Sequence, residues 1–488
     1  MNVSISKARL NVNLTKEQND CIESKSKDLL IKGGAGSGKT LVLLKKAIKI
    51  KNEAVRNNQN IKIAFFTYAK TLTKYSEELI DEIENDDKYK DMLTISTFHS
   101  YTSKLVMAVN GRFSKNIDVG KTNQENKKKI LEDCLESQSK IYTNHRLYKL
   151  EKEFWIDEIS WIKGKRIKSK EEYINGDRTG RGSGVRLSKK DKEIVYSFYE
   201  EYNNRLKRGG YIEYNDMSNI VLDKFNLLSE KYKFDYVLVD EAQDLSYSQL
   251  LLLKKIATQG IIIAADHAQK IYKNSFTWSE LGINVRGNAS KSLVKNFRST
   301  REIMELSYDL LKNNKSHKGK DTEFTNHVIP DINGNRPVIF KCENSSVEEN
   351  TLIKLLNNLN DDETTIGIPF RSWKERNKLV NILKKQGIDF EHIKDKDEWT
   401  LLEPGVKLVT MHSAKGLEFD VVIIPMVDQG IIPKAIDCEE DKEAFLESER
   451  SLLYVAMTRA KDELYILTSN PSQFIDEMDK NLYDLIEQ

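Results

Sequence analysis

The sequence has few cysteines and no long apolar run. Its four cysteines, Cys21, Cys134, Cys342 and Cys438, form no CxxC pair, which argues against a zinc or iron–sulfur site and favours a reducing compartment. No apolar stretch approaches the roughly 18 residues of a membrane-spanning helix, and the polar N-terminus is unlike a signal peptide. We therefore expect a cytoplasmic protein without a membrane contact.

An excess of one charge is also lacking. The 77 Lys and Arg residues nearly balance 75 Asp and Glu residues, and the net charge is +2. A basic field over the whole molecule is thereby excluded, so any nucleic-acid surface must be local. With 488 residues, 39% of them hydrophobic, the chain is long enough for about two to four globular domains.

What the sequence does contain is a glycine-rich turn between an apolar strand and a helix, DLLIKGGAGSGKTLVL at residues 28–43. The spacing from the first glycine to GKT fits the phosphate-binding loop at every position. Glycines let successive N–H groups turn inward, and the helix N-terminus adds positive potential. Lys39 would reach the β- and γ-phosphates of ATP, and the Thr40 hydroxyl would coordinate Mg²⁺. The predicted nucleotide-binding residues of this loop are Gly33, Gly34, Ala35, Gly36, Ser37, Gly38, Lys39 and Thr40.

Strands and helices alternate after the loop. Apolar strands run into helices at 61–70 and 93–106, and two further strands that end in polar residues occur at 234–246 and 260–272. Such alternation is typical of a parallel sheet with crossover helices. A second series of strands and helices follows from about residue 286. We therefore predict an α/β protein with two parallel-sheet domains.

A lysine-rich helical stretch interrupts the first domain. Within it, residues 175–190 form a basic loop, which either tracks a phosphate backbone through Arg178, Arg181 and Arg186 or is a solvated charge run. The predicted domains are a first α/β domain at 1–111 and 220–285, a helical insertion at 112–219 and a second α/β domain at 286–488.

Asp240 and Glu241 follow a hydrophobic strand about 200 residues after the loop. A phosphate-loop ATPase needs one carboxylate for Mg²⁺ and a second one that deprotonates the attacking water. A solvated pair of acids at a strand end is the common alternative. Since the loop is present, we predict Thr40 and Asp240 as metal ligands and Glu241 as the base.

Taken together, the motifs resemble those of the UvrD/Rep/PcrA group of superfamily 1A DNA helicases, in the right order and over most of the chain. The matching segments are LTKEQ (14–18, Q motif), GAGSGKT (34–40, motif I), FFTYAKT (65–71, Ia), TFHS (97–100, Ib), DEAQD (240–244, II), DHAQKIY (266–272, III), NFRST (296–300, IV), TMHSAKGLEF (410–419, V) and residues 447–465 (VI). The resemblance implies that both α/β domains are RecA-like.

The resemblance also implies roles for residues outside the loop. Gln18 would recognise adenine, Gln269 would sense the γ-phosphate and Glu418 would contact the ribose. Arg298 and Arg459 would contact the γ-phosphate, because a guanidinium fork suits the negative charge of phosphoryl transfer; either arginine alone would be expected in a surface ion pair. The expected catalytic residues are Lys39, Asp240, Glu241, Gln269, Arg298 and Arg459.

Motifs Ia, Ib, III and V imply contacts with single-stranded DNA, where aromatic faces stack on bases. The candidates are Phe66, Tyr68, His99, Tyr272, Trp278, Thr410 and His412. Tyr68 replaces the usual asparagine, and Trp278 in QKIYKNSFTW lies several residues later than in the family pattern QSIYxWRG. A core position is the alternative for each aromatic residue.

The large helical insertion that relatives carry between motifs IV and V is missing, because GIDFEHI at 387–393 is followed almost at once by the strand of motif V. We predict an ATP- and Mg²⁺-dependent 3′–5′ translocase or helicase that acts on single-stranded DNA or on junctions between single and double strands. One alternative is a DNA-sensing ATPase subunit that regulates a partner nuclease, as in UvrD-like anti-phage systems. The other is an RNA-directed motor.

Overall fold

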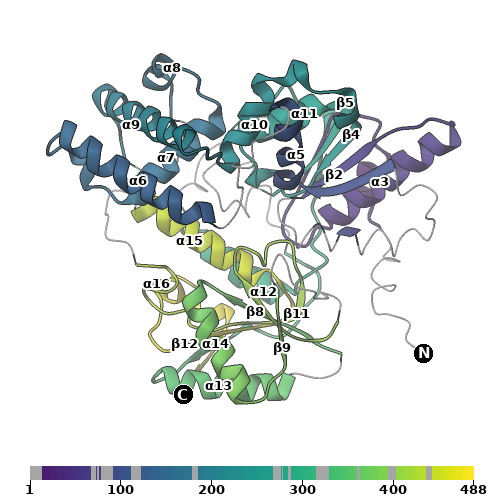
Figure 1. The fold of residues 1–488 in the computed structure, drawn as a ribbon. Helices are drawn as coiled ribbons and strands as arrows, with labels where there is room; N and C mark the ends of the chain where they lie inside the picture. The colour runs from purple at the N-terminus through teal and green to yellow at the C-terminus, as the bar shows by residue number, and fades with distance from the viewer. Residues whose placement is uncertain are drawn as a thin grey trace.

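The computed structural model describes residues 14–67, 73, 76–77, 92–110, 122–178, 185–266, 276, 278–283, 287–314, 329–359, 363–393, 403–435 and 442–488. In these ranges the chain forms two α/β domains, one above the other in Figure 1, with a helical insertion beside the first. Both sheets are parallel, as two RecA-like domains require.

The first sheet has the strand order β3-β2-β4-β5-β1-β6. Its central strands are apolar on both faces because helices cover both sides. Leu29 and Ile31 pack towards α2 and α3, whereas Leu30 packs towards α5, α10 and α11. The strands are β1 (Leu29–Gly33), β2 (Ile63–Thr67), β3 (Leu93–Thr97), β4 (Phe234–Val239), β5 (Ala257–Ala265) and β6 (Ser290–Leu293). The helices are α2 (Lys16–Glu23), α3 (Lys39–Arg56), α5 (Phe98–Asn110), α10 (Tyr214–Asp223) and α11 (Tyr247–Ile256).

The second sheet has the order β13-β7-β12-β11-β8-β10-β9. Helices α12 and α15 cover the face nearer the first domain, and their core includes Ala35 of the phosphate loop (Figure 1). The strands are β7 (Val338–Lys341), β8 (Thr365–Phe370), β9 (Phe390–His392), β10 (Gly405–Thr410), β11 (Phe419–Ile424), β12 (Ala460–Thr468) and β13 (Asp484–Glu487). The helices are α12 (Arg301–Leu311), α13 (Ser345–Leu359), α14 (Trp373–Lys385), α15 (Lys442–Met457) and α16 (Gln473–Asp476).

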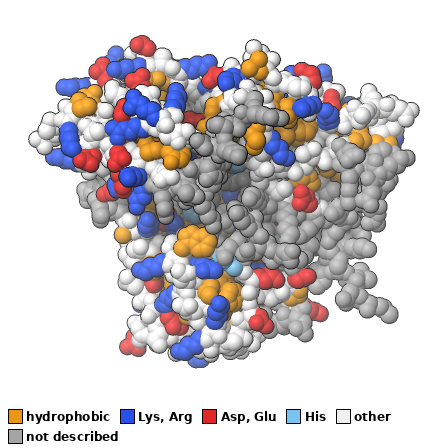
Figure 2. All heavy atoms as spheres, in the orientation of Figure 1, with side chains coloured by type: hydrophobic (Ala, Val, Ile, Leu, Met, Phe, Trp, Pro, Cys, Tyr) orange, Lys and Arg blue, Asp and Glu red, His pale blue; other side chains and the backbone are white. Residues whose placement is uncertain are grey.

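The insertion has a core of its own. It is centred on Trp155, whose ring lies 4.2 Å from that of Phe198 and 5.1 Å from that of Tyr148, centroid to centroid. On its surface, basic and acidic side chains are interspersed at the upper left of Figure 2. Its helices are α6 (Thr122–Ile141), α7 (Lys152–Lys165), α8 (Lys170–Asn175) and α9 (Lys189–Arg208).

Two predicted domain boundaries need correction. Helix α10 begins inside the predicted insertion, yet Met217 and Val221 pack in the core of the first domain. Strand β6 lies in the predicted second domain, yet it pairs with β1 of the first sheet, Leu30 against Ser290. Composition locates such boundaries only roughly, because long-range packing decides which core a short segment joins.

The basic loop of the insertion is in part structural. Arg178 is paired with Glu158, which is completely buried, and its Nη1 donates to the carbonyl of Val185 at 2.6 Å. These bonds hold the loop onto α7 and occupy the guanidinium of Arg178. The prediction that Arg178 contacts a phosphate backbone is therefore wrong. Arg186 is exposed, and Arg181 lies outside the described residues.

Among the described residues, no helix is long and apolar enough to cross a membrane. The thiols of Cys21, Cys134 and Cys342 are free and buried, and burial raises the pKa of each of them. They are therefore protonated and poorly reactive at neutral pH.

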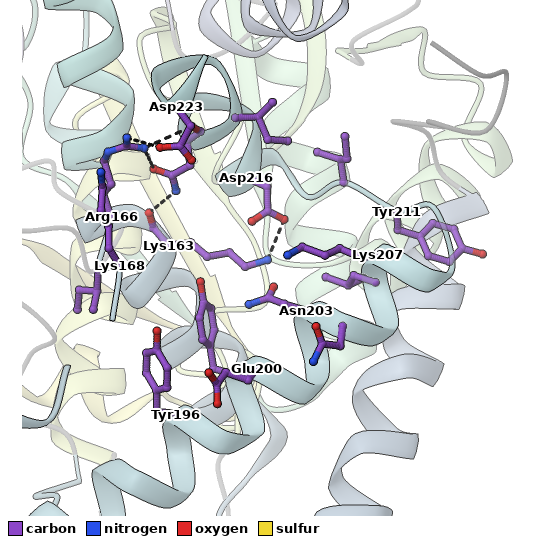
Figure 3. A pocket seen from close by; sticks show the side chains of 17 residues that line it. Lys163, Arg166, Lys168, Tyr196, Glu200, Asn203, Lys207, Tyr211, Asp216 and Asp223 are labelled. Atoms are coloured by element: carbon purple, nitrogen blue, oxygen red, sulfur yellow. Dashed lines mark hydrogen bonds and ion pairs between the residues drawn. The ribbon is translucent and has the colours of Figure 1, made fainter. Parts of the chain in front are cut away.

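A buried lysine joins the insertion to the first domain. The Nζ atom of Lys163 on α7 donates to Glu213 at 2.6 Å and to Asp216 at 2.8 Å, at the start of α10. Figure 3 shows Lys163 and Asp216 pointing toward one another in a pocket of about 820 Å³ between α7, α9 and α10. The two carboxylates offset the cost of burying the ammonium, and they raise the pKa of Lys163 although burial opposes this.

Replacing Lys163 by Met should destabilise the protein by about 3 kcal/mol, because two partly buried carboxylates then lose their counter-ion. Thermal and denaturant unfolding followed by circular dichroism measure the loss. The matched control is Lys140→Met, which removes an exposed pair with Glu136 and should leave the stability almost unchanged, because solvent screens such pairs. Equal effects of the two substitutions would contradict this account of the junction.

Candidate active site and nucleic-acid surface

The phosphate loop connects β1 to α3, as predicted. Gly36 and Gly38 have φ angles of 68° and 79°, a left-handed conformation that favours glycine. A Cβ atom on Gly38 would lie 2.8 Å from Nε2 of Gln18. That same Nε2 donates to the carbonyl of Ser37 at 3.1 Å, so the predicted adenine-recognising residue is packed onto the loop.

Lys39 and Thr40, the first two residues of α3, both form side-chain hydrogen bonds within the protein. Lys39 donates to the carbonyls of Gly33 at 2.9 Å and Gly34 at 2.8 Å, and its Nζ lies 3.6 Å from the Oδ2 of Asp266. Thr40 donates from its hydroxyl to Asp240 at 2.6 Å. The loop, the lysine and the first acid of motif II therefore form one site at the carboxyl ends of the strands.

Asp240 and Glu241 have different electrostatic environments. Burial, and then the charge of Glu241, raise the pKa of Asp240 to about 6. Burial alone would also raise the pKa of Glu241, but Lys415, Lys39 and Arg459 outweigh it and hold that pKa below its ordinary value. Glu241 is therefore ionised at neutral pH, as a base that accepts a proton must be.

The second domain contacts the loop through residues 296–298. The N–H of Phe297 donates to the carbonyl of Gly36 at 2.9 Å. A Cβ atom on Gly36 would collide with Asn296 and would lie 2.7 Å from the Cβ of Arg298. Arg298 in turn donates to Glu418 at 2.8 Å, so the structure brings two of the predicted nucleotide-contacting residues together beside the phosphate loop.

Arg459 is almost completely buried in the turn between α15 and β12. Its guanidinium donates to the carbonyls of Val455 at 2.9 Å and Leu417 at 3.4 Å. Burial and the nearby charge of Arg298 lower the pKa of Arg459 to about 9, so it remains a cation at neutral pH. Its charge also acts on Glu241, which is consistent with a position facing the same site.

Sequence reasoning missed Lys415, which links the two domains. Its Nζ donates to Asp244 at 2.6 Å and lies 3.6 Å from Glu241, although it follows β10 of the second sheet. The acids raise its pKa against the effect of burial. The signal was present, because the lysine lies within SAKGLEF and the acids of DEAQD need a counter-ion once they are buried.

The expectation that Phe66 stacks on DNA is wrong. Phe66 is completely buried in the middle of β2, and its ring lies 5.2 Å from that of Tyr101. Trp278 is only 5% exposed and packs against Phe276 in the same core, so it too has no free face for a base. In both cases apolar packing against neighbouring helices takes precedence over the position within a motif.

The other described candidates lie nearer the surface. His99 is half-buried, and burial lowers its pKa to about 4, so the ring is neutral at physiological pH. It packs edge-on at 4.8 Å against Tyr214, an exposed aromatic that sequence reasoning missed. Thr410 accepts from the N–H of Ser413 at 3.0 Å, and His412 is exposed beside it.

Three predicted residues, Tyr68, Gln269 and Tyr272, lie outside the described residues. In the part of the chain that the structure describes, no group of three or more His, Cys, Asp or Glu side chains forms a metal cluster. Thr40 and Asp240, one hydroxyl and one carboxylate oxygen at 2.6 Å, are nevertheless the hard ligands that Mg²⁺ takes when phosphates complete its shell.

Comparison with known proteins identifies similar chains. A family profile described as the UvrD/REP helicase N-terminal domain matches residues 14–279, and the UvrD-like helicase C-terminal domain matches residues 291–397 and 392–471. A probable DNA helicase II homolog of Mycoplasma capricolum is 24% identical over 676 aligned positions, which cover 97% of this chain and 88% of that protein. The ATP-dependent DNA helicase PcrA of Staphylococcus epidermidis is 22% identical over 658 positions, with 97% and 87% covered. A solved C-terminal domain of a possible DNA helicase from Lactobacillus plantarum covers 39% of this chain and 98% of its own, at 25% identity and a TM-score of 0.30.

Replacing Lys415 by Met should raise the pKa of Glu241, because the largest of its counter-charges is removed. The acid limb of the pH profile for ATP hydrolysis should then shift to higher pH. At a fixed pH on that limb, the rate should fall about tenfold for each unit by which the pKa of Glu241 rises. The matched control is Lys407→Met, which removes a buried lysine of β10 that pairs with Glu391; its acid limb should not move. An unchanged limb in the Lys415 variant would contradict the pairing.

Proposed function

The chain belongs to the UvrD/REP helicase family, and from this premise we propose that it is an ATP-driven motor that moves 3′ to 5′ along single-stranded DNA. It is a DNA helicase of the UvrD/PcrA type and a hydrolase. The observation that supports ATP coupling best is the site shared by the two domains. Lys39, Thr40 and the acids of motif II come from the first domain, and Arg298 and Lys415 come from the second.

The nucleotide would bind between these two sets of residues. The loop N–H groups and Lys39 would hold the phosphates once the lysine exchanges its two carbonyl partners for phosphate oxygens. Phe297 is 42% exposed, and its backbone N–H donates to the carbonyl of Gly36. Its ring would stack on the adenine base, and Gln18 would hydrogen-bond to the edge of that base. Glu418 would contact the ribose after releasing Arg298.

Thr40 and Asp240 would hold a magnesium ion, which neutralises charge on the β- and γ-phosphates when it is bound. Glu241 would orient a water molecule and accept its proton as the water oxygen attacks the γ-phosphorus and the bond to the bridging oxygen breaks. Arg298 and Arg459 would stabilise the negative charge that develops on the equatorial oxygens. Because these arginines belong to the second domain, hydrolysis would loosen the contact between the domains.

The short connection in the second domain favours a motor that lacks a second helical insertion. Strand β9 ends at His392 and β10 begins at Gly405, whereas the alignments with relatives are longer than this chain. A DNA-sensing ATPase subunit that regulates a partner nuclease is therefore the second candidate, since strand separation would not then be its task. An RNA track is the third.

One set of assays separates the three candidates. We expect ATP hydrolysis to rise strongly with a single-stranded DNA oligonucleotide and to fall steeply with added salt, because phosphate contacts release counter-ions. A matched RNA oligonucleotide tests the choice of track, and unwinding of a duplex with a 3′ tail tests polarity against a 5′ tail. Translocation without unwinding would favour the role of a DNA-sensing accessory subunit. ATP hydrolysis that does not change when DNA is added would contradict the proposal of a DNA motor.

Glu241→Gln should lower ATP hydrolysis by about 10²- to 10⁴-fold, the contribution of a general base, while ATP still binds. Lys39→Ala should abolish hydrolysis and weaken ATP binding as well. Steady-state rates and binding of a fluorescent ATP analogue measure the two effects. Lys49→Ala, which removes a half-buried lysine of α3 that pairs with Glu23, should hydrolyse and bind ATP like the wild type. Near-normal turnover of Glu241→Gln would show that another group is the base.

A further inference from the structure

An exposed tryptophan is the first residue of α14, directly after the turn that follows β8. Trp373 is 58% exposed, whereas Trp155, Trp161 and Trp278 are each 5% exposed or less. A single exposed aromatic residue is ordinary on a protein surface, so its surroundings decide whether the exposure has a function.

The indole of Trp373 is held on several sides by neighbouring side chains. The ring of His392 meets it edge-on at 5.7 Å, the ring of Phe370 lies at 6.4 Å, and the guanidinium of Arg376 lies 5.7 Å from its centroid. The turn is anchored as well, because Arg371 donates twice to Glu449, at 3.1 and 2.8 Å. A ring held in this way loses little conformational entropy when a planar ligand stacks on it.

The turn lies beside the predicted nucleic-acid residues of motif V. Phe370 is in register with Thr410 in the parallel pair β8–β10, and the N–H of Met411 donates to the carbonyl of Phe370 at 2.9 Å. Trp373 and the exposed His412 therefore occupy the same edge of the second sheet. Lys374, also exposed, and Arg376 add positive charge there.

We propose that Trp373 is a base-stacking platform for single-stranded nucleic acid in the second domain, flanked by Arg376 and His392. The inference rests on the proposed function and adds a contact to the same track. An aromatic face beside cations is the chemistry that binds single strands without reading their sequence. In the described part of the first domain, Phe66 and Trp278 lie in the core, so neither supplies this stacking.

The test compares Trp373→Ala and Trp373→Phe with the wild type in the full chain. Affinity for a fluorescein-labelled oligothymidine is measured by anisotropy, and the oligonucleotide concentration that half-maximally stimulates ATP hydrolysis is measured in parallel. Trp373→Ala should weaken both by about 5- to 150-fold, the factor that corresponds to roughly 1–3 kcal/mol for one stacked base. Trp373→Phe should restore most of the affinity, because it keeps a π-face.

A spectroscopic measurement separates stacking from a merely structural role. Binding of the oligonucleotide should quench the wild-type tryptophan emission, and most of this quench should be absent in Trp373→Phe although that variant still binds. The matched control is Leu227→Ala, which truncates another exposed hydrophobic residue, 62% exposed, and should change neither affinity nor quench. Circular dichroism and thermal melting establish that each variant is folded.

The outcomes distinguish this inference from the proposed function. A wild-type protein that is stimulated by DNA, together with a Trp373→Ala variant of equal affinity, would overturn the stacking platform and leave the motor intact. So would a quench that persists in Trp373→Phe, or a Trp373→Ala variant that keeps its DNA affinity but loses a protein partner. A wild-type protein that neither binds nor responds to DNA would overturn the proposed function itself.

Discussion

The contact between the two domains depends on a balance of buried charge. Asp240, Glu241 and Asp244 lie at the carboxyl end of the first sheet, where they are almost completely removed from water. Burying carboxylates is costly unless cations face them. Lys39 of the first domain supplies one positive charge that favours the ionised form of Asp240 and Glu241, and Lys415 of the second domain supplies another through its ion pair with Asp244. The acids of one domain are thus stabilised partly by the other, so the relative position of the domains and the ionisation of the base depend on each other.

This balance suits a site that binds an anionic substrate. In the structure Lys39 donates to two loop carbonyls, which are weaker acceptors than a phosphate, and Arg298 is held near the loop by the carboxylate of Glu418. Charge-assisted bonds to phosphate oxygens are stronger than bonds to neutral carbonyls. An incoming triphosphate therefore exchanges partners within one small volume, and the groups that must rearrange already lie close to their new positions. The close approach of Gly36 to Asn296 carries that rearrangement directly to the second domain.

Local sequence patterns were sufficient to predict part of the fold and part of the ATP site. The phosphate loop, the strands and the acids of motif II were predictable because each is specified by residues adjacent in sequence. The motif that contains Lys415 was also visible, but its partner was not predictable, since the bond to Asp244 joins positions 171 residues apart. The predictions that Phe66 and Trp278 stack on DNA failed for a related reason. Helices that pack on the sheet bury both residues, and no short motif indicates that packing. Arg178 shows the same limit, because this loop residue pairs with Glu158, which is buried on helix α7.

The turn after β10 connects the two halves of the proposed mechanism over a very short distance. Thr410 lies at the edge that also carries Trp373, and Lys415 five residues later reaches the acids of the ATP site. The turn is internally braced, because the N–H of Ala414 donates to the carbonyl of Thr410 at 2.8 Å. We propose that a nucleic acid bound at one end of this turn would act on the other end through these short contacts. If Thr410 and His412 contact the nucleic acid as proposed, coupling between the track and hydrolysis would require no long chain of contacts, because the same turn carries Lys415.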